Sequence, residues 1–327
     1  MSFDRLILDN AHRQQHTAPD ETGHAVLDVL AGTSLDEAAR RIRIEPSDLA
    51  AAVELYQQAG CQALREQGAA KDWWQIYVHF ADWDTAEDVA VRHLTPVLNE
   101  TATEWWFIRK HPCWRLRLRA VDGVKDSVTE ALDGIVAAGH LHRWWPGIYE
   151  PENIAFGNAI GMKIAHELFH ADSRAILEVR LGGESPLGRR ELSVLLCTIL
   201  MRAAGVEWYE QGDVWRRVAE DRPLPADIPP ARVEALADDL RKLLRADTSP
   251  DGMLLSPDGP LSFAAEWVEG FRRAGRALGT ATRSGALDRG LRHVLAYHVI
   301  FHWNRLGLPY RQQCVLAWTA QKVILET

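Results

Sequence analysis

The segment Glu104–Ala120, EWWFIRKHPCWRLRLRA, contains two short apolar runs separated by a break at Pro112. The first run, Trp105–Arg109, is rich in aromatic residues, which favour β-strands. The second run, Trp114–Ala120, alternates strictly between apolar residues and arginines, which is the period of a strand with two different faces. A proline-containing turn between two such runs predicts a β-hairpin.

The alternation places Arg115, Arg117 and Arg119 on one face of the second strand. Rows of arginine suit the planar, bidentate capture of carboxylate, phosphate or amide oxygens. A basic outer face on an edge strand, which deters aggregation, is the alternative. The pattern alone leaves both interpretations open.

The composition excludes some classes of protein. The chain has 327 residues, 47% of them hydrophobic, which suffices for one large domain or two small ones. Its net charge of −8 argues against a nucleic-acid-binding protein that relies on bulk electrostatics. The 13 tryptophans either line a groove for a planar or peptide ligand or fill the core.

The cysteines and the hydropathy pattern indicate a cytoplasmic protein. The four cysteines form no CxxC pair, so neither a disulfide framework nor a zinc ribbon is expected. The N-terminal segment lacks a signal-type apolar run, and no stretch approaches the ~20 apolar residues of a membrane span. We therefore expect no membrane association.

Residues 1–70 form a small helical segment in this interpretation. Helices are predicted at His24–Gly32, from a Ser34 cap to about Arg43, and from Pro46 to Gly60, with Gln62–Ala70 as a linker or helix continuation. Glu37 lies three residues after Ser34, as in a capping box. Three short helices with a tight turn resemble a helix-turn-helix, but the mixed charges favour a docking segment over DNA binding.

Residues 71–327 form the second predicted domain. Its first part has the order βαββαβ, which is typical of a ferredoxin-like antiparallel layer, and the rest is mostly helical, so the fold class is α+β. The expected strands are Trp74–Phe80, Trp105–Arg109, Trp114–Val121 and His140–Tyr149, and the expected helices are Asp84–Leu98 with a kink at Pro96, Gly123–Ala138, Ile160–Gly182, Arg190–Gln211, Ala231–Leu244, Leu261–Leu278, Leu287–Leu306 and Tyr310–Glu326.

Three stretches carry candidate chemistry. The sequence HELFH at 166–170 matches the HExxH pattern of zinc hydrolases and lies in a predicted helix. On the helix near the C-terminus, His298, His302 and Arg305 share one face, either as satisfied core residues or as an acid/base group. The loop Tyr149–Gly157 joins a strand to a helix, where sites are common, although an ordinary connection is equally compatible with it.

Together these stretches resemble one family. WWFIRKHPCWRLRLR, YEPENIAFGNAIGMKIAHELFHADSRAIL and HVIFHWNRLGL are similar to the thiopeptide-type bacteriocin biosynthesis domain, which is related to the C-terminal glutamate-elimination domain of class I lantibiotic dehydratases. The resemblance extends from about Trp73 to the C-terminus. In that family the helix ending LFHADS is structural and holds no metal, so a zinc hydrolase becomes a remote alternative.

One chemistry of the family is glutamate elimination, which converts glutamylated Ser or Thr to a dehydro amino acid. The resemblance matches its arginine pair to Arg117 and Arg119 and its glutamate to Glu152. Ala155 stands at the position of a family arginine, and Ile300 stands at the position of a family histidine. An elimination without these two groups loses proton removal and carboxylate stabilisation.

The other chemistry is pyridine synthesis, a formal aza-[4+2] cycloaddition of two dehydroalanines that expels water and the leader peptide. It requires substrate folding, hydrogen-bond donors for an amide and a mild acid/base group. The resemblance therefore favours a pyridine synthase, with the elimination subunit of a split dehydratase as the alternative. A pseudoenzyme that only binds the leader peptide is a third class.

The resemblance also implies a set of site residues and partners. We expect Arg117 and Arg119 to polarise carbonyl oxygens and His302 or Tyr297 to move the tautomerising proton. The expected substrate-binding residues are Arg115, Glu152, His298, Trp303, Asn304 and Arg305. No cofactor and no metal are expected. The expected partners are a leader-bearing precursor peptide with dehydroalanines and azoles and a partner dehydratase, but no nucleic acid.

Overall fold

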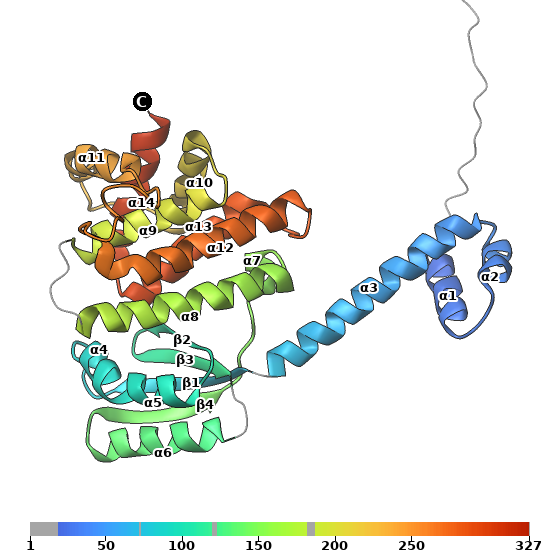
Figure 1. Ribbon diagram of the computed structural model, residues 1–327, viewed down its shortest axis with the longest axis horizontal. Coiled ribbons are helices and arrows are strands. Elements are labelled where there is room, and N and C mark those ends of the chain that lie inside the picture. The colour runs from blue at the N-terminus through green and yellow to red at the C-terminus, as the bar shows by residue number, and fades with distance from the viewer. Residues whose placement is uncertain (1–18, 72, 120–122, 182–186, 327) are drawn as a thin grey trace, which may run out of the picture. The chain divides into compact units, whose positions relative to one another are not determined.

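The computed structural model describes residues 19–71, 73–119, 123–181 and 187–326 (Figure 1). The chain divides into two compact units, Met1–Ala69 and Ala70–Thr327.

The first unit contains the helices α1 (Pro19–Leu30), α2 (Leu35–Ile42) and α3 (Pro46–Lys71). Ser34 caps α2 by accepting a hydrogen bond from the Glu37 backbone N–H at 3.4 Å. The Glu37 carboxylate pairs with Arg41 at 3.5 Å, so the second bond of the predicted capping box is replaced by an i,i+4 ion pair. The third helix does not end at Gly60, because a single glycine only weakens a helix interior. Of the two alternatives for Gln62–Ala70, the helix continuation is confirmed.

The second unit begins with a four-stranded antiparallel sheet. Its strands are β1 (Trp73–Phe80), β2 (Trp105–Lys110), β3 (Cys113–Arg119) and β4 (Leu141–Gly147), in the order β2-β3-β1-β4. This order and the βαββαβ connectivity confirm the ferredoxin-like layer within an α+β fold. Because β3 pairs with both β1 and β2, its arginines lie on an interior strand, which excludes the edge-strand interpretation.

One face of the sheet is covered by α4 (Ala86–Val89), the π-helical turn η1 (Ala90–Leu94), α5 (Thr95–Thr101) and α6 (Val124–Ala137) (Figure 1). The first three replace the single helix that the sequence predicted with a kink at Pro96. The break is the π turn, where the Thr95 hydroxyl donates to the carbonyl of Ala90 at 3.1 Å. Pro96 occupies the first turn of α5, where its missing N–H costs nothing.

Helix α8 (Ala159–Leu181) covers the free edge of β2. The backbone N–H of Trp105 donates to His170 Nδ1 at 3.2 Å, and that of Phe107 donates to the Ser173 hydroxyl at 3.2 Å. Side chains of α8 thus satisfy edge groups that would otherwise be available for pairing with another chain.

The remainder of the unit is helical, as predicted. Its elements are α7 (Asn153–Phe156), α9 (Arg189–Ala203), α10 (Trp208–Asp221), α11 (Pro230–Arg245), the 3₁₀ turn η2 (Ser262–Ala264), α12 (Ala265–Arg283), α13 (Leu291–Leu306) and α14 (Tyr310–Leu325). The short helix α7 lies in the stretch that the sequence presented as a loop.

The predicted helix Arg190–Gln211 is in fact two helices. Gly205 has a φ of +82°, which ends the first helix, and a capping box between Glu207 and Glu210 starts the second. Gly212, which the sequence placed behind the helix, lies inside α10. It faces Ile324 and Leu325, and a Cβ at this position would clash with both side chains.

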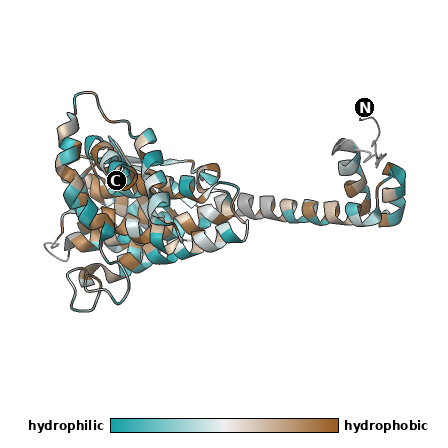
Figure 2. Ribbon diagram, turned by 90° about the horizontal axis from the view of Figure 1, so that it is seen from above, coloured by the Kyte–Doolittle hydropathy of each residue, from teal (hydrophilic) through white to brown (hydrophobic). Residues whose placement is uncertain are grey.

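The core of the second unit is continuous from the sheet through the helices. In Figure 2 the helices carry brown and teal residues in alternation, as expected when each helix buries one face. Within the described ranges, no helix is long and apolar enough to cross a membrane.

Candidate functional site

The side chain of Arg117 lies in the interior of the second unit, only 4% exposed. Its Nε donates to Gln75 Oε1 at 2.8 Å, and its guanidinium carbon lies 4.2 Å from the ring centroid of Trp106 and 4.8 Å from that of Tyr149. Its Nη1 is buried and has no hydrogen-bond partner. A buried N–H donor without a partner is rare, and a group that accepts a hydrogen bond would be stabilised there.

The strand register explains this arrangement. Gln75 of β1 and Trp106 of β2 are the direct partners of Arg117 on the two sides of β3, so all three side chains project from the same face. Tyr149 follows the end of β4 and closes over the guanidinium. Aromatic rings on two sides compensate the burial of the cation through cation–π attraction.

The hydroxyl of Tyr149 lies 2.7 Å from Nε2 of His166 on α8. Burial lowers the pKa of His166 to about 3, with help from the charges of Arg119 and Arg117. Burial also raises the pKa of Tyr149. At neutral pH the imidazole is therefore neutral and the phenol is protonated. The Tyr149 hydroxyl can thus donate a hydrogen bond to Nε2 of His166.

Glu152 provides an anion beside this group. It is half-buried, and its Oε2 is buried without a hydrogen-bond partner. Burial lowers the pKa of Arg117, whereas the neighbouring Tyr149 and the charge of Glu152 oppose that shift. No ion pair or hydrogen bond between Arg117 and Glu152 occurs in the described structure. We call Arg117, Tyr149, Glu152 and His166 the Arg117 cluster.

The other two arginines of the row differ from Arg117. Arg119 is partly exposed and pairs through Nε with Glu104 at 2.9 Å. Arg115 is half-buried and lies with its guanidinium carbon 5.6 Å from the ring centroid of Tyr77. The row therefore supplies one buried guanidinium with a free N–H, one that is paired and one that is partly open.

The polar face of α13 points into the core, toward Asp172 of α8. His302 Nδ1 lies 2.9 Å from Oδ2 of Asp172 on α8, and Arg305 Nε donates to the same oxygen at 2.7 Å. All three side chains are fully buried. Asp172 thus holds both groups of that face in the core, and the role of His302 in moving the tautomerising proton stays a prediction.

Two more residues of the predicted binding set are also buried. His298 is packed against Phe156 and Phe169, and burial lowers its pKa to about 3. Trp303 donates from Nε1 to the Ser193 hydroxyl at 2.7 Å and has no exposed surface. Direct contact of these side chains with a substrate would require α13 to move.

Tyr297 and Asn304 lie on the other, partly exposed side of α13. Arg289 stacks on Tyr297, with 5.0 Å between the guanidinium carbon and the ring centroid. Asn304 Oδ1 accepts a hydrogen bond from Gln313 Nε2 at 3.2 Å. Their roles in catalysis and binding stay predictions.

The two histidines of the HELFH stretch have separate partners. His166 bonds to Tyr149, whereas His170 Nδ1 lies 3.2 Å from the Trp105 backbone nitrogen and 2.9 Å from its carbonyl oxygen. No group of three His, Cys, Asp or Glu side chains in the described parts of the chain has a metal-binding arrangement. In this structure the pattern therefore serves the Arg117 cluster and the edge of β2.

Sequence reasoning assigned no individual role to Gln75, Trp106 and Tyr149, and it considered His166 only as part of the HExxH pattern. For Gln75 and Trp106 a signal was present, because the strand alternation places each of them on a definite face. For His166 no local signal could identify the partner, since Tyr149 lies on a separate segment.

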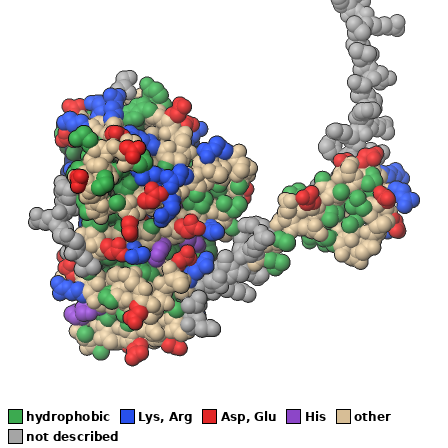
Figure 3. All heavy atoms as spheres, in the orientation of Figure 1, with side chains coloured by type: hydrophobic (Ala, Val, Ile, Leu, Met, Phe, Trp, Pro, Cys, Tyr) green, Lys and Arg blue, Asp and Glu red, His purple; other side chains and the backbone are tan. Residues whose placement is uncertain are grey.

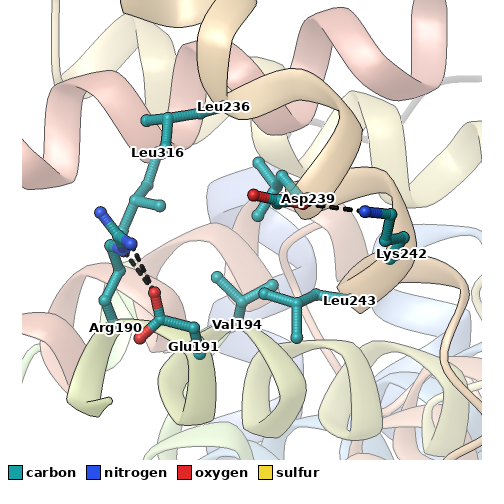
Figure 4. A pocket seen from close by; sticks show the side chains of 9 residues that line it. Arg190, Glu191, Val194, Leu236, Asp239, Lys242, Leu243 and Leu316 are labelled. Atoms are coloured by element: carbon teal, nitrogen blue, oxygen red, sulfur yellow. Dashed lines mark hydrogen bonds and ion pairs between the residues drawn. The ribbon is translucent and has the colours of Figure 1, made fainter. Parts of the chain in front are cut away.

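A separate pocket of about 330 Å³ lies between α9, α11 and α14 (Figure 4). Val194, Leu236, Leu240, Leu243 and Leu316 form its apolar walls, and the ion pairs Arg190–Glu191 and Asp239–Lys242 lie on its rim. No residue of the sheet or of the Arg117 cluster lines this pocket.

Comparison with known proteins identifies the second unit. A family model described as lantibiotic biosynthesis dehydratase C-term matches residues 73–324, which confirms the resemblance seen in the sequence. No curated protein matches the chain.

Solved structures share the fold at low sequence identity. They include the tRNA-dependent lantibiotic dehydratase MibB from Microbispora sp. 107891 (TM-score 0.55, 22% identity), TsrL (0.52, 16%) and the pyridine synthase TbtD from thiomuracin biosynthesis (0.57, 14%). The matches cover 79%, 78% and 78% of this chain. They span only 28% of the MibB chain, but 95% of TsrL and 98% of TbtD.

Proposed function

The chain belongs to the lantibiotic biosynthesis dehydratase C-terminal family, and we propose that it is a pyridine synthase that matures a thiopeptide-like precursor. Its substrate in this proposal is a leader-bearing peptide with two dehydroalanines and azole rings. A partner dehydratase supplies the dehydroalanines, because their formation is a separate reaction.

The observation that carries the proposal is the pair of unpartnered atoms in the Arg117 cluster. Arg117 offers a free N–H, and Glu152 offers a free carboxylate oxygen. An amide has the complementary pattern, with a carbonyl oxygen that accepts and an N–H that donates. A site with one buried cation and one nearby anion therefore suits an amide better than it suits a free carboxylate, which Glu152 would repel.

Cycloaddition begins with the conversion of such an amide to its iminol. The amide nitrogen loses its proton to Glu152, while the oxygen, polarised by Arg117, gains a proton from the Tyr149 hydroxyl. His166 orients that hydroxyl through the 2.7 Å contact. During the later loss of water, Glu152 gives its proton to the departing hydroxyl group and the Tyr149 phenolate takes a proton from the ring, so both residues return to their starting states. The resulting azadiene forms two carbon–carbon bonds with the second dehydroalanine, and loss of water and the leader amide makes the ring aromatic.

The walls of the cluster suit a planar substrate. Trp106, Tyr149 and Trp73 present ring faces or edges around Arg117 and His166. Azole rings stack on aromatic side chains, and stacking holds the reacting alkenes close together, which lowers the entropic cost of the cycloaddition. In this proposal Tyr297 and Asn304 contact the peptide from α13, and Arg119 serves at the edge of the cluster.

Glutamate elimination is the second candidate function. The retained arginine pair and Glu152, which the family resemblance matches to elimination residues, favour it. Against it, Ala155 and Ile300 replace two further groups, and Ile300 is buried in the core. The side chains at these two positions can neither remove a proton nor bind a carboxylate.

Mass spectrometry separates the candidates. The full-length protein is incubated with a leader-bearing peptide that contains thiazoles and two dehydroalanines, and in parallel with a glutamylated serine peptide. Cycloaddition releases the leader as a separate fragment and removes water from the core. Loss of glutamate from the second peptide would instead establish elimination. Tight binding of the leader without either mass change would establish a leader-binding pseudoenzyme.

A further inference from the structure

The face of the sheet that carries Arg117 continues beyond the Arg117 cluster. Tyr77 of β1 pairs with Arg115 of β3 on one side and with Trp145 of β4 on the other, so the three side chains share this face. Arg143 lies two residues before Trp145 and pairs with His79, which places it on the same face. We call Tyr77, Arg115, Arg143 and Trp145 the cationic sheet face.

The side chains of this face form one ordered arrangement. The rings of Tyr77 and Trp145 stack with 5.2 Å between their centroids and 11° between their planes. The guanidinium carbon of Arg143 lies 4.7 Å from the ring centroid of Trp145. Arg115 makes the corresponding contact with Tyr77 at 5.6 Å. The stacking holds both cations near the sheet and fixes their separation.

This part of the sheet is open. Tyr77, Arg115 and Trp145 are half-buried, and Arg143 is exposed. The helices α5 and α6 cover the opposite face, where Trp144 donates to Asp133 of α6. Arg115 and Arg117 are two residues apart on β3, so this more exposed part of the face adjoins the Arg117 cluster.

The positive charge of the cationic sheet face is not neutralised by acidic side chains of the described residues. Arg115 and Arg143 form no ion pair with a carboxylate of any described residue. Lys110, near Arg115, has its pKa lowered by burial and by the charges of Arg115 and Arg117. The chain as a whole carries a charge of −8, and the face shown in Figure 3 mixes acidic and basic side chains. A local excess of unpaired cations in an acidic protein favours an acidic ligand.

We propose that the cationic sheet face binds an acidic, extended segment of the precursor peptide and guides the reacting residues toward the Arg117 cluster. This inference rests on the proposed peptide substrate. The stacked rings provide a platform for apolar or aromatic side chains, and the two guanidinium groups bind carboxylates on either side of that platform.

The distance between the two arginines determines how far apart the acidic residues of the bound peptide should be. Arg115 and Arg143 are two strand spacings apart and offset by two residues, which puts their Cα atoms roughly 12 Å apart. An extended chain rises about 3.3 Å per residue, so acidic residues three to four positions apart match both arginines. Single-stranded nucleic acid also combines negative charge with stacking, but the net charge of −8 disfavours a phosphate backbone.

Fluorescence anisotropy with the full-length protein tests this proposal. The probe is a fluorescein-labelled 12-residue peptide with glutamates four positions apart around a central Trp, compared with the same peptide carrying Gln. Substitution of both Arg115→Gln and Arg143→Gln should weaken binding of the Glu peptide by about tenfold. Arg92→Gln is the matched control, because Arg92 is exposed on η1, one of the elements that cover the opposite face.

The outcomes separate this inference from the proposed function. Selective loss of Glu-peptide binding in the double variant supports the cationic sheet face, even if the protein catalyses no reaction. Unchanged affinity in the double variant overturns it, and so does a labelled single-stranded oligonucleotide that binds more tightly than the peptide. Turnover of a full precursor with an unchanged KM in the double variant would also overturn it while leaving the pyridine synthase proposal intact.

Discussion

The hydroxyl oxygen of Tyr149 lies 2.7 Å from Nε2 of His166. The two residues belong to a post-strand loop and to the helix α8, and they meet directly beside the guanidinium of Arg117. This contact joins a phenol, an imidazole and a buried cation in one place, which is the composition of a proton-transfer site.

Replacing Tyr149 tests this site. Tyr149→Phe keeps the ring over Arg117 but removes the hydroxyl, so turnover in the proposed reaction should fall by about 10²–10⁴-fold with little change in melting temperature. His166→Phe should have a similar effect, and the double variant should lose no more than either single variant, because the two groups act together. Tyr209→Phe, at an exposed position on α10, is the control. Full activity of Tyr149→Phe would remove the hydroxyl from the mechanism.

The guanidinium of Arg117 gives a second prediction. Arg117→Lys keeps the positive charge but loses the planar fork that bonds Gln75 and stacks on Trp106. We expect kcat to fall by about 10²–10³-fold, as when one preorganised donor is removed, and Arg117→Ala to abolish turnover. Circular dichroism should show folded protein in both cases. Wild-type kcat in Arg117→Lys would contradict the assignment. Arg92→Lys, at an exposed position on η1, is the control variant.

The buried ion pair at Asp172 predicts a large effect on stability. Asp172→Asn removes the anion that compensates Arg305 and His302 in the core, and it should lower the free energy of unfolding by about 3–5 kcal/mol. Urea denaturation followed by tryptophan fluorescence measures this in the second unit, because every tryptophan of the chain lies at or after Trp73.

The matched control for Asp172→Asn is Asp239→Asn. Asp239 pairs with Lys242 on the surface of α11, and the urea midpoint should not move. Equal effects of the two substitutions would mean that the core pair contributes nothing beyond a surface pair.

The pH dependence of stability follows from His298. Burial lowers the pKa of His298 to about 3, below its ordinary value near 6.5. Between these two values the unfolded state binds a proton that the folded state excludes. Stability is therefore full above pH 6.5 and falls as the pH drops toward 3, by up to about 1.4 kcal/mol per pH unit for this group.

Urea midpoints measured from pH 7 to pH 4 test this slope. His298→Phe retains an aromatic ring between Phe156 and Phe169 but cannot be protonated, so its stability should depend less steeply on pH than that of the wild type. Identical slopes in the two proteins would show that His298 does not control acid unfolding. His166 contributes in the same direction, because burial lowers its pKa to about 3 as well.

The sequence alone determined the sheet and most of the helices. Strict alternation in Trp114–Ala120 gave the strand that carries the arginines, and the strand and helix order gave the ferredoxin-like layer. These features are local, because a period of two or 3.6 residues follows from backbone geometry. The sequence also identified Arg117 and Glu152, whose free atoms carry the proposed chemistry, through the family resemblance.

The neighbours of each polar face, by contrast, follow from how the elements pack. The helical period places His302 and Arg305 on one face of α13, but it does not determine which element packs against that face. The carboxylate of Asp172 on α8 pairs with both groups and holds them in the core, and the same helix turns His166 toward Tyr149. Contacts between separate elements, two of which here join residues more than a hundred positions apart, depend on how the layers pack, and local periodicity contains no information about that packing.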